Sequence, residues 1–275
     1  MKIPFVKMHG AGNDFVVLDR RHAFPNEGLE SLVARMCDRR RGIGADGVLF
    51  LDPDRELDFA MGYYNSDGRR ADYCGNGARC LARYALDAGL GRGGRVRFRT
   101  DVGNQEATRQ GDGINLHFGL LAAPADPITV EAAGRTFLGR LVRAGVPHFV
   151  TAAERVEWVP LSEWGSALRH HARFGADGAN VDFVARLGPS RLAMRTYERG
   201  VEGETLACGS GAIASALWAA SSGTTSPVGI VTAGGDELVV SFRATPKGYD
   251  VDLAGPAEVA FVGEWSERVA ANAPA

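Results

Sequence analysis

The feature that most constrains this chain is an internal repeat. The segment CGNGARCLARYAL (residues 74–86) has a counterpart in CGSGAIASALWAA (residues 208–220), and each opens with Cys-Gly-x-Gly-Ala before an alanine-rich stretch. Tyr64 and Tyr197 begin the polar, glycine-containing loops that end at the two cysteines, and these loops differ in length by one residue. A repeat with so long a period indicates duplication of a domain rather than a solenoid.

The repeat continues on both sides of the cysteine segments. Upstream, two shorter stretches are echoed later in the chain, residues 12–17 by 145–150 and residues 44–51 by 178–185. Downstream, one order of strand, glycine turn, strand, turn and strand is expected twice, over residues 96–119 and 228–255. Alternating apolar and polar positions there predict half-buried antiparallel strands at residues 114–118, 237–244 and 249–255.

These patterns predict an α+β protein of two pseudo-symmetric domains, each a curved mixed sheet wrapped against its own helix. The boundary is expected near LLAAPADP, residues 120–127. We therefore predict an N-terminal domain over residues 1–120 with Cys74 and a C-terminal domain over residues 121–275 with Cys208. The last strand and tail, about residues 262–275, are expected to return to the N-terminal domain. The active site is expected in the cleft between the domains.

The two alanine-rich helices differ in polarity. Residues 212–220 carry no charge and are apolar on every side, so this helix is predicted to lie inside the protein. The first helix carries Arg79, Arg83 and Asp87 at four-residue spacing, which predicts one solvated stripe.

Charge and composition exclude several classes of function. A formal net charge of −2 gives no reason to expect a nucleic acid or another polyanion as partner. The start, MKIPFVKMHG, lacks the apolar core of a signal peptide, and no apolar run approaches the roughly 18 residues that span a membrane. The 4 cysteines are sparse for 275 residues and indicate reduced thiols. A cytoplasmic location without membrane attachment is therefore expected.

Each repeated cysteine lies where a glycine-rich loop becomes a helix. Helix starts present unsatisfied N–H donors and a partial positive charge, which favour thiolate over thiol and offer a docking place for a carboxylate. Two thiols flanking one carbon can invert it, because one removes a proton from one face and the other delivers a proton to the opposite face. Cys74 and Cys208 are therefore predicted as paired acid–base catalysts facing each other across the domain cleft.

This chemistry is demanding, because a proton beside a carboxylate is far less acidic than a thiol. A mismatch of about ten pKa units corresponds to about 14 kcal/mol, whereas one oxyanion donor supplies roughly 3 kcal/mol. Several donors are needed, and two converging helix N-termini can provide them. Pyridoxal phosphate would need a Schiff-base lysine, but the only lysines are Lys2, Lys7 and Lys247, none near a phosphate-cradling motif. A cofactor-free reaction is expected.

The other thiols, and the possibility of a metal, are interpreted differently. Cys37 and Cys80 are expected to pack in the core, and the position that matches Cys80 in the second copy is Ala214. No CxxC, HxH or HExxH spacing occurs, so no zinc site is expected.

Three groups of polar residues lie outside the cysteine motifs and have different expected roles. His170 and His171, beside arginines, indicate a solvated helix face. His148 is either the cap of a loop or a site residue, and both interpretations stay open from the residues alone. Glu198 and Arg199 lie in the loop that leads to Cys208 and are predicted as site residues.

Four segments together resemble one known family, diaminopimelate epimerase: KMHGAGNDFVVLD, NSDGRRADYCGNGARCLARY, GANVDFV and YERGVEGETLACGSGA. The resemblance extends from Lys7 to about Trp265, and the two cysteine motifs are highly specific. It implies a cofactor-independent isomerase that interconverts LL- and meso-diaminopimelate, in bacterial lysine and peptidoglycan precursor synthesis. It also implies a homodimer and two domains, each a barrel-like sheet around a central helix.

The resemblance also implies roles for individual residues. Cys208 takes the α-proton of the LL isomer, Cys74 donates on the other face, and the roles exchange in reverse. His148 and Glu198 match positions that support the cysteines and orient the reacting amino group. The N–H groups of four residues would hold the reacting carboxylate: Gly75, Asn76, Gly209 and Ser210. Other substrate-holding positions correspond to Asn13, Asn65, Asn180, Glu198 and Arg199.

The chain departs from the family pattern at three points. Val146 stands where many members have asparagine, Gly47 stands where some have a substrate-contacting glutamine, and the loop from Glu198 to Cys208 is one residue longer than in many. These differences concern contacts at the distal end of the substrate.

Three alternatives remain from the residues. A two-thiol racemase of proline or hydroxyproline would need an apolar or small distal pocket, which the polar set Asn13, Asn65, Asn180 and Arg199 disfavours. A thiol redox or metal-binding protein would use Cys74 with Cys80 instead. A non-catalytic module would bind diaminopimelate and release no α-proton to water.

Overall fold

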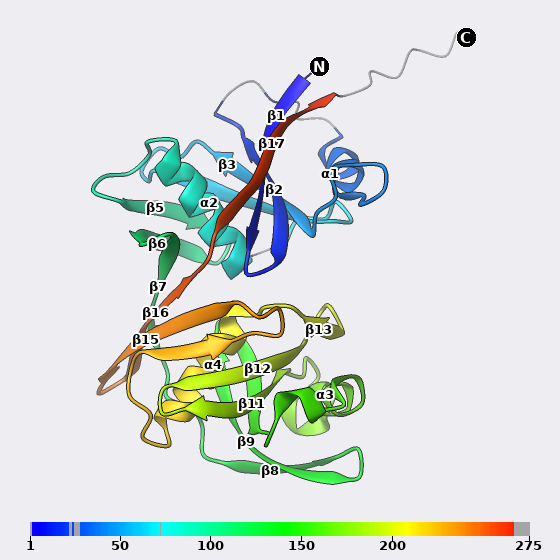
Figure 1. Cartoon of the computed structure of the whole chain (residues 1–275), viewed down its shortest axis with the longest axis vertical. Coiled ribbons are helices and arrows are strands. Elements are labelled where there is room, and N and C mark those ends of the chain that lie inside the picture. The colour runs from blue at the N-terminus through cyan, green and yellow to red at the C-terminus, as the bar shows by residue number, and fades with distance from the viewer. Residues whose placement is uncertain (1, 22–23, 25–27, 72, 267–275) are drawn as a thin grey trace. The chain divides into compact units, whose positions relative to one another are not determined.

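The computed structural model describes residues 2–21, 24, 28–71 and 73–266 (Figure 1). The chain divides into two compact units. Unit 1 comprises residues 1–114 and 257–275, and unit 2 comprises residues 115–256. The end of the predicted tail, residues 267–275, lies outside the described residues.

In the part of unit 1 that the structure describes, there are two helices and strands from both ends of the chain. Its elements are β1 (Lys2–Gly10), β2 (Asn13–Asp19), α1 (Leu29–Cys37), β3 (Gly47–Asp52), β4 (Phe59–Asn65), α2 (Gly75–Asp87), β5 (Arg95–Thr100), β6 (Gly103–Gln110) and β17 (Glu258–Ser266). The sheet begins with β17, β1 and β2, which pair antiparallel in that order. It continues with β2 parallel to β3 and β3 antiparallel to β4. It ends with β4 parallel to β5 and β5 antiparallel to β6.

Unit 2 begins within β7 (Gly113–Leu121), which spans the boundary between the units. Its further elements are β8 (Ile128–Ala132), β9 (Arg135–Ala144), β10 (Val146–Ala152), η1 (Val156–Trp158), α3 (Leu161–Arg169), η2 (Ala172–Phe174), β11 (Asn180–Gly188), β12 (Arg191–Glu198), β13 (Gly203–Thr205), α4 (Gly209–Ala220), β14 (Val228–Val231), β15 (Glu237–Thr245) and β16 (Gly248–Gly255). The strands β8 to β12, β14 and β15 pair in the same sequence of antiparallel and parallel steps as in unit 1.

The two pairing schemes match strand for strand, and β17 stands in unit 1 where β8 stands in unit 2. The predicted α+β fold with an internal duplication is therefore confirmed. The three segments predicted as half-buried antiparallel strands also form, as β7, β15 and β16.

Strand register aligns the two copies residue by residue. Phe15 lies opposite Gly47 in the β2–β3 pair, and His148 lies opposite Asn180 in the β10–β11 pair. Two residues further along, Leu49 lies opposite Tyr63 in the β3–β4 pair, and Asp182 lies opposite Thr196 in the β11–β12 pair. Phe15, Leu49 and Tyr63 are thus the counterparts of His148, Asp182 and Thr196. Matching residues 44–51 to residues 178–185 was wrong by one position, because the register sets Gly47 against Asn180.

One prediction about the two central helices is confirmed and the other is wrong. Helix α4 is buried from Gly211 to Leu217, as its apolar sequence predicts. Helix α2 does not present one solvated stripe, because Arg79 is 0% exposed. Its guanidinium donates to Asn76 Oδ1 at 2.8 Å, so the residue belongs to the interior of unit 1. Arg83 and Asp87 do form an exposed pair.

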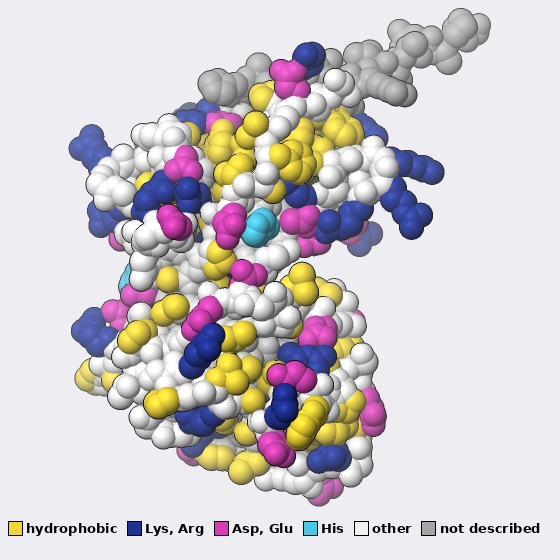
Figure 2. All heavy atoms as spheres, in the orientation of Figure 1, with side chains coloured by type: hydrophobic (Ala, Val, Ile, Leu, Met, Phe, Trp, Pro, Cys, Tyr) yellow, Lys and Arg dark blue, Asp and Glu magenta, His cyan; other side chains and the backbone are white. Residues whose placement is uncertain are grey.

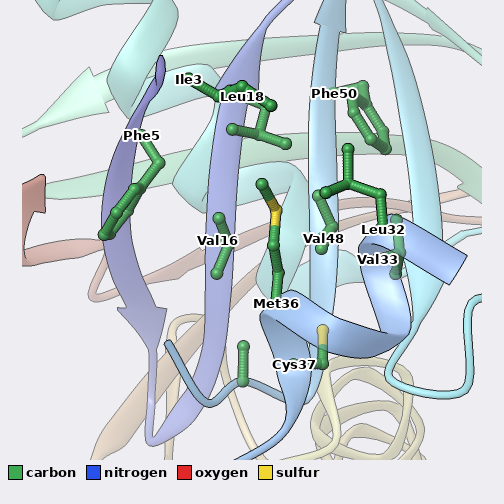
Figure 3. Close-up of a cluster of buried hydrophobic side chains, with 11 residues drawn as sticks. Ile3, Phe5, Val16, Leu18, Leu32, Val33, Met36, Cys37, Val48 and Phe50 are labelled. Atoms are coloured by element: carbon green, nitrogen blue, oxygen red, sulfur yellow. The ribbon is translucent and has the colours of Figure 1, made fainter. Parts of the chain in front are cut away.

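Each unit has its own apolar core. In unit 1, side chains from β1, β2 and β3 pack against one face of α1 (Figure 3). In unit 2, α3 packs against β8, β11 and β12, and Phe183 and Tyr197 are part of this core. Cys37 lies in the first of these cores and Cys80 is fully buried in α2, as expected of packing residues. Among the described residues, no helix is long and apolar enough to cross a membrane.

Candidate active site

Cys74 is the residue that caps the N-terminus of α2. Its backbone is extended, with φ −141° and ψ 116°, and its side chain accepts a hydrogen bond from the Gly77 N–H at 3.5 Å. The thiol also donates to Asn13 Oδ1 at 3.5 Å, and the Asn76 amide donates to the same oxygen at 3.3 Å. Cys74 is partly exposed. The thiol therefore sits at the positive end of a helix, with amides on both sides.

Cys208 has the same place at the N-terminus of α4. Its backbone has φ −121° and ψ 110°, and its sulfur accepts from the Gly211 N–H at 3.4 Å. Ser210 Oγ lies 3.4 Å from the sulfur. Since the first turn of a helix has N–H groups without intrahelical acceptors, both cysteines border a ready anion site. The local geometry of the sequence repeat is thus conserved between the two units.

The surroundings of Cys208 disfavour a thiolate in equilibrium with water. Burial raises the pKa of the Cys208 thiol well above its usual value, and the charges of Glu198 and Asp182 raise it further. A hydrogen bond between Ser210 and the sulfur, and another from the Gly211 N–H, act in the opposite direction and are outweighed. Burial also raises the pKa of Cys37 and of Cys80 to about 12, so those two thiols are poorly suited to acid–base work.

Glu198 ends β12 and is mostly withdrawn from solvent. Its Oε2 accepts a hydrogen bond from Thr205 Oγ1 at 2.8 Å. Burial raises the pKa of this carboxyl, although the Thr205 hydroxyl and His148 both favour the charged form. A buried carboxyl with a raised pKa close to a thiol holds a proton more readily than an exposed carboxyl does, which makes it a candidate acid–base group.

His148 lies at the centre of a buried polar cluster behind Cys208. Its Nδ1 is 2.7 Å from Asp182 Oδ2, and both side chains are 0% exposed. Its Nε2 is 3.0 Å from Ser210 Oγ and 3.2 Å from Asn180 Nδ2. The Thr196 hydroxyl donates to the other Asp182 oxygen at 2.7 Å. Of the two open interpretations of His148, this cluster favours a site residue, since its contacts lead to Cys208.

The polar residues of unit 1 are arranged differently. Asn13 is held by Asp46, because its Nδ2 donates to Asp46 Oδ2 at 2.7 Å. Asp14 beside it accepts from Lys7 at 2.6 Å and from Arg39 at 2.7 Å. This ionic network fixes the loop that presents the Asn13 amide to Cys74.

The sequence relationships agree with this geometry. A family model described as "Diaminopimelate epimerase" matches residues 5–120 and 140–257. A protein of the same name from Aquifex aeolicus is 39% identical over 278 residues, covering 96% of this chain and 98% of that protein. Another, from Methanocella arvoryzae, is 40% identical and covers 96% of each chain.

The chain belongs to the diaminopimelate epimerase family. Solved structures share the family's fold at low identity. A PhzF-family phenazine biosynthesis protein from Bacillus anthracis has a TM-score of 0.74 at 11% identity, covering 97% of this chain and 100% of its own. A hydroxyproline epimerase from Agrobacterium vitis has a TM-score of 0.65 at 15% identity, covering 96% and 92%. These likenesses concern the fold alone.

Most of the residues predicted for this family member's site gather around one of the two cysteines. Cys74, Gly75, Asn76 and Asn13 lie together in unit 1. In unit 2, the cluster around Cys208 contains Gly209, Ser210, His148, Asn180 and Glu198. The Arg199 N–H donates to Asn180 Oδ1 at 2.7 Å, which brings Arg199 to the same cluster. Asn65 ends β4 and is exposed.

Two further residues of the cluster, Asp182 and Thr196, are not among those expected from sequence. The available signal was an acidic residue inside GANVDFV, where the surrounding strand is apolar. Such a residue is costly to bury unless it has partners. Its partners come from β10 and β12, so only the sheet register brings them together.

Proposed function

We propose that this protein interconverts LL- and meso-2,6-diaminopimelate without a cofactor, by a two-base mechanism, in bacterial lysine and peptidoglycan precursor synthesis. The observation that carries the proposal is the pair of cysteines that cap α2 and α4 with matching backbone geometry. Family membership and the printed names of the relatives agree with it. The proposed location is the cytoplasm.

In the forward direction, Cys208 takes the α-proton of the LL isomer while Cys74 delivers a proton to the opposite face. The negative charge that develops on the substrate carboxylate is stabilised by first-turn N–H groups, those of Gly75, Asn76, Gly209 and Ser210. Each such donor is worth roughly 3 kcal/mol, so a set of several reduces a barrier that a single thiol could not overcome. In the reverse direction the two cysteines exchange roles.

The rest of the substrate would be held by polar side chains on both units. We assign Asn13 and Asn65 in unit 1, and Asn180, Glu198 and Arg199 in unit 2, to this task. Glu198 and His148 would also support the reacting centre. Such a set suits a second amino-acid group better than the ring of proline, which has no second zwitterion.

The test is exchange of the α-proton with solvent deuterium, measured with diaminopimelate and, separately, with proline. Cys74→Ala and Cys208→Ala should each abolish epimerisation. Cys80 lies within α2, the helix that Cys74 caps, and Cys80→Ala therefore serves as the matched control. If the α-proton exchanged with proline but not with diaminopimelate, the proposed substrate would be wrong and a cyclic amino acid would take its place. Full activity in either Cys74→Ala or Cys208→Ala would refute the two-base scheme.

We also propose that the protein works as a homodimer. The support is an apolar surface on β17, where Val259, Phe261 and Val262 are 50%, 48% and 71% exposed. Figure 2 shows apolar side chains gathered on the face of unit 1 that carries this strand. An apolar patch of this kind indicates a protein contact. Sedimentation equilibrium of the wild-type protein and of Val262→Lys tests it: a wild-type monomer at micromolar concentration would contradict the proposal.

A further inference from the structure

A continuous row of hydrogen bonds leads from Cys208 into the core of unit 2. It runs from Cys208 Sγ to Ser210 Oγ at 3.4 Å, from Ser210 Oγ to His148 Nε2 at 3.0 Å, and from His148 Nδ1 to Asp182 Oδ2 at 2.7 Å. The Thr196 hydroxyl closes the row by donating to Asp182 Oδ1 at 2.7 Å. Asp182, at its inner end, has no part in the proposed function so far.

Neighbouring contacts fix the direction in which each proton points. The Asn180 carbonyl oxygen accepts from the Arg199 N–H at 2.7 Å, so the Asn180 amide nitrogen faces His148 Nε2 and donates to it at 3.2 Å. Nε2 is therefore an acceptor, and His148 carries its proton on Nδ1, donated to Asp182. Ser210 must then donate to Nε2, which leaves its oxygen free to accept from the Cys208 thiol.

The duplicated fold shows that this row is not needed to build the unit. In unit 1 the position of His148 is taken by Phe15 and that of Asp182 by Leu49, both 0% exposed. Leu49 approaches α2 as closely as Asp182 approaches α4. A Cβ added to Gly77 would meet Leu49 at 2.8 Å, and one added to Gly211 would meet the Asp182 carboxylate at 2.6 Å.

Buried ionisable groups of this kind are generally no more stabilising than apolar ones of similar size. The polar version in unit 2 therefore needs a reason other than stability. The contacts of the row supply one, because they connect a buried carboxylate to the sulfur that has to become a base.

We propose that Asp182 is a positioning residue that allows the proton of Cys208 to be stored on His148. In this step the S–H bond breaks as the Ser210 oxygen gains that proton, while the Ser210 O–H bond breaks as His148 Nε2 gains its proton. The result is a thiolate at Cys208 and an imidazolium held by Asp182, with no proton released to water. The relay deepens the proposed function and rests on it, since it prepares Cys208 to remove an α-proton.

The direct effect of the Asp182 charge on Cys208 has the opposite sign. The titratable groups around the sulfur are Glu198, Asp182 and His148, and the two carboxylates by themselves disfavour a thiolate. If Asp182 acted only through its charge, its neutralisation would make Cys208 more reactive. If it acts through His148, its neutralisation makes Cys208 less reactive. The two roles are therefore distinguished by the direction of one measurement.

The experiment measures alkylation of Cys208 by iodoacetamide across the pH range, by peptide mass spectrometry, in a Cys74→Ala background. Asp182→Asn keeps the shape of the side chain and removes its charge. We expect alkylation at pH 7 to slow at least tenfold, and Ser210→Ala, which interrupts the row, to slow it similarly. Thr196→Val removes one hydrogen bond but keeps the charge, so it should have a smaller effect.

An unchanged or faster rate in Asp182→Asn overturns the inference, and so does a parent Cys208 that resists alkylation at every pH. Cys74, followed in a Cys208→Ala background, should not respond to Asp182→Asn, and a response confined to Cys74 would also overturn it. Thermal unfolding identifies a variant that has lost its fold, in which case Ser210→Ala decides the matter. Because no substrate is present, the outcome is independent of whether diaminopimelate is epimerised.

Discussion

The two cysteine sites share a backbone and differ in what lies behind it. Cys74 and Cys208 both cap a helix and both accept from the N–H three residues later, at 3.5 and 3.4 Å. Behind Cys74 the sheet presents Phe15 and Leu49, whereas behind Cys208 it presents His148 and Asp182. Duplication preserved the helix start, which is made of local sequence, and allowed the packing beneath it to diverge.

The difference suggests that the two thiols obtain their protonation states by different means. Cys208 is 5% exposed and borders two carboxylates, so exchange of its proton with water is unfavourable and an internal acceptor is useful. Cys74 is partly exposed and borders neutral amides, so exchange with its surroundings is easier. We call the buried residues behind each cysteine its floor: Phe15 and Leu49 behind Cys74, and His148 and Asp182 behind Cys208. On this interpretation an apolar floor is sufficient for Cys74 and insufficient for Cys208.

The largest effect should come from replacing the polar residues behind Cys208 in unit 2 by their apolar counterparts from unit 1. The double variant His148→Phe/Asp182→Leu removes the relay and should lower kcat by at least about 100-fold, the lower range of what a positioned acid–base group contributes. Its free energy of unfolding should be unchanged or higher by about 1–4 kcal/mol, because apolar groups replace a buried carboxylate and the imidazole hydrogen-bonded to it. Steady-state kinetics and urea unfolding of the same preparation measure both. Loss of activity together with loss of the fold would mean that the polar floor is structural.

The opposite exchange should be costly. Leu49→Asp places a carboxylate behind Cys74 beside Phe15, with none of the partners that Asp182 has. An uncompensated buried charge typically lowers the free energy of unfolding by about 3–5 kcal/mol. Leu49→Asn, which is similar in size and uncharged, is the matched control and should lose less. A Leu49→Asp variant as stable as wild type in urea would show that the floor of unit 1 can accept a charge unaided.

Sequence alone predicted what is encoded locally and failed where tertiary packing decides. The cysteine caps, the apolar helix α4 and the alternating strands β15 and β16 follow from short patterns, and all of them form. The spacing of Arg79, Arg83 and Asp87 predicted a solvated stripe, but periodicity does not reveal which side of α2 meets the sheet. Arg79 is on the buried side.

The role of Asp182 was missed for a related reason. Its partners are 34 and 14 residues away along the chain, and they meet only when β10, β11 and β12 pair in their observed register. One residue of slip, as in the alignment taken from sequence, sets Asp182 against the wrong position of unit 1. The comparison with Leu49 therefore depends on the sheet and not on the repeat.

A smaller effect is expected from the ionic network that is found only in unit 1. Burial acts to raise the pKa of the Asp14 carboxyl, but hydrogen bonds from Arg39 and Lys7 outweigh it and hold the pKa well below its usual value. The counterpart in β10 is Pro147, which has no charge. A lowered folded-state pKa means that the stabilisation is complete above the unfolded value of about 3.9 and is lost as the pH falls through the folded-state pKa.

Asp14→Asn should therefore lower the free energy of unfolding by about 2 kcal/mol at pH 7, the scale of hydrogen bonds to a charged group. Below pH 4 the difference from wild type should shrink. Urea unfolding at pH 7, 5 and 3 measures this, with Asp112→Asn, an exposed carboxylate in the same unit, as the control. A difference that grows towards low pH would reverse the assigned sign.

The smallest effect should come from Cys80, which is matched by Ala214 in the other helix. Both residues are fully buried, so Cys80→Ala gives α2 the side chain that α4 already has. Loss of the sulfur should lower the free energy of unfolding by about 1 kcal/mol, a typical cost for one substitution in a core. The rate of epimerisation should stay within about twofold, because a thiol whose pKa burial raises to about 12 takes no part in proton transfer. A large fall in rate with intact stability would instead support a working pair of Cys74 and Cys80, and it would remove the symmetry on which the comparison of the two helices rests.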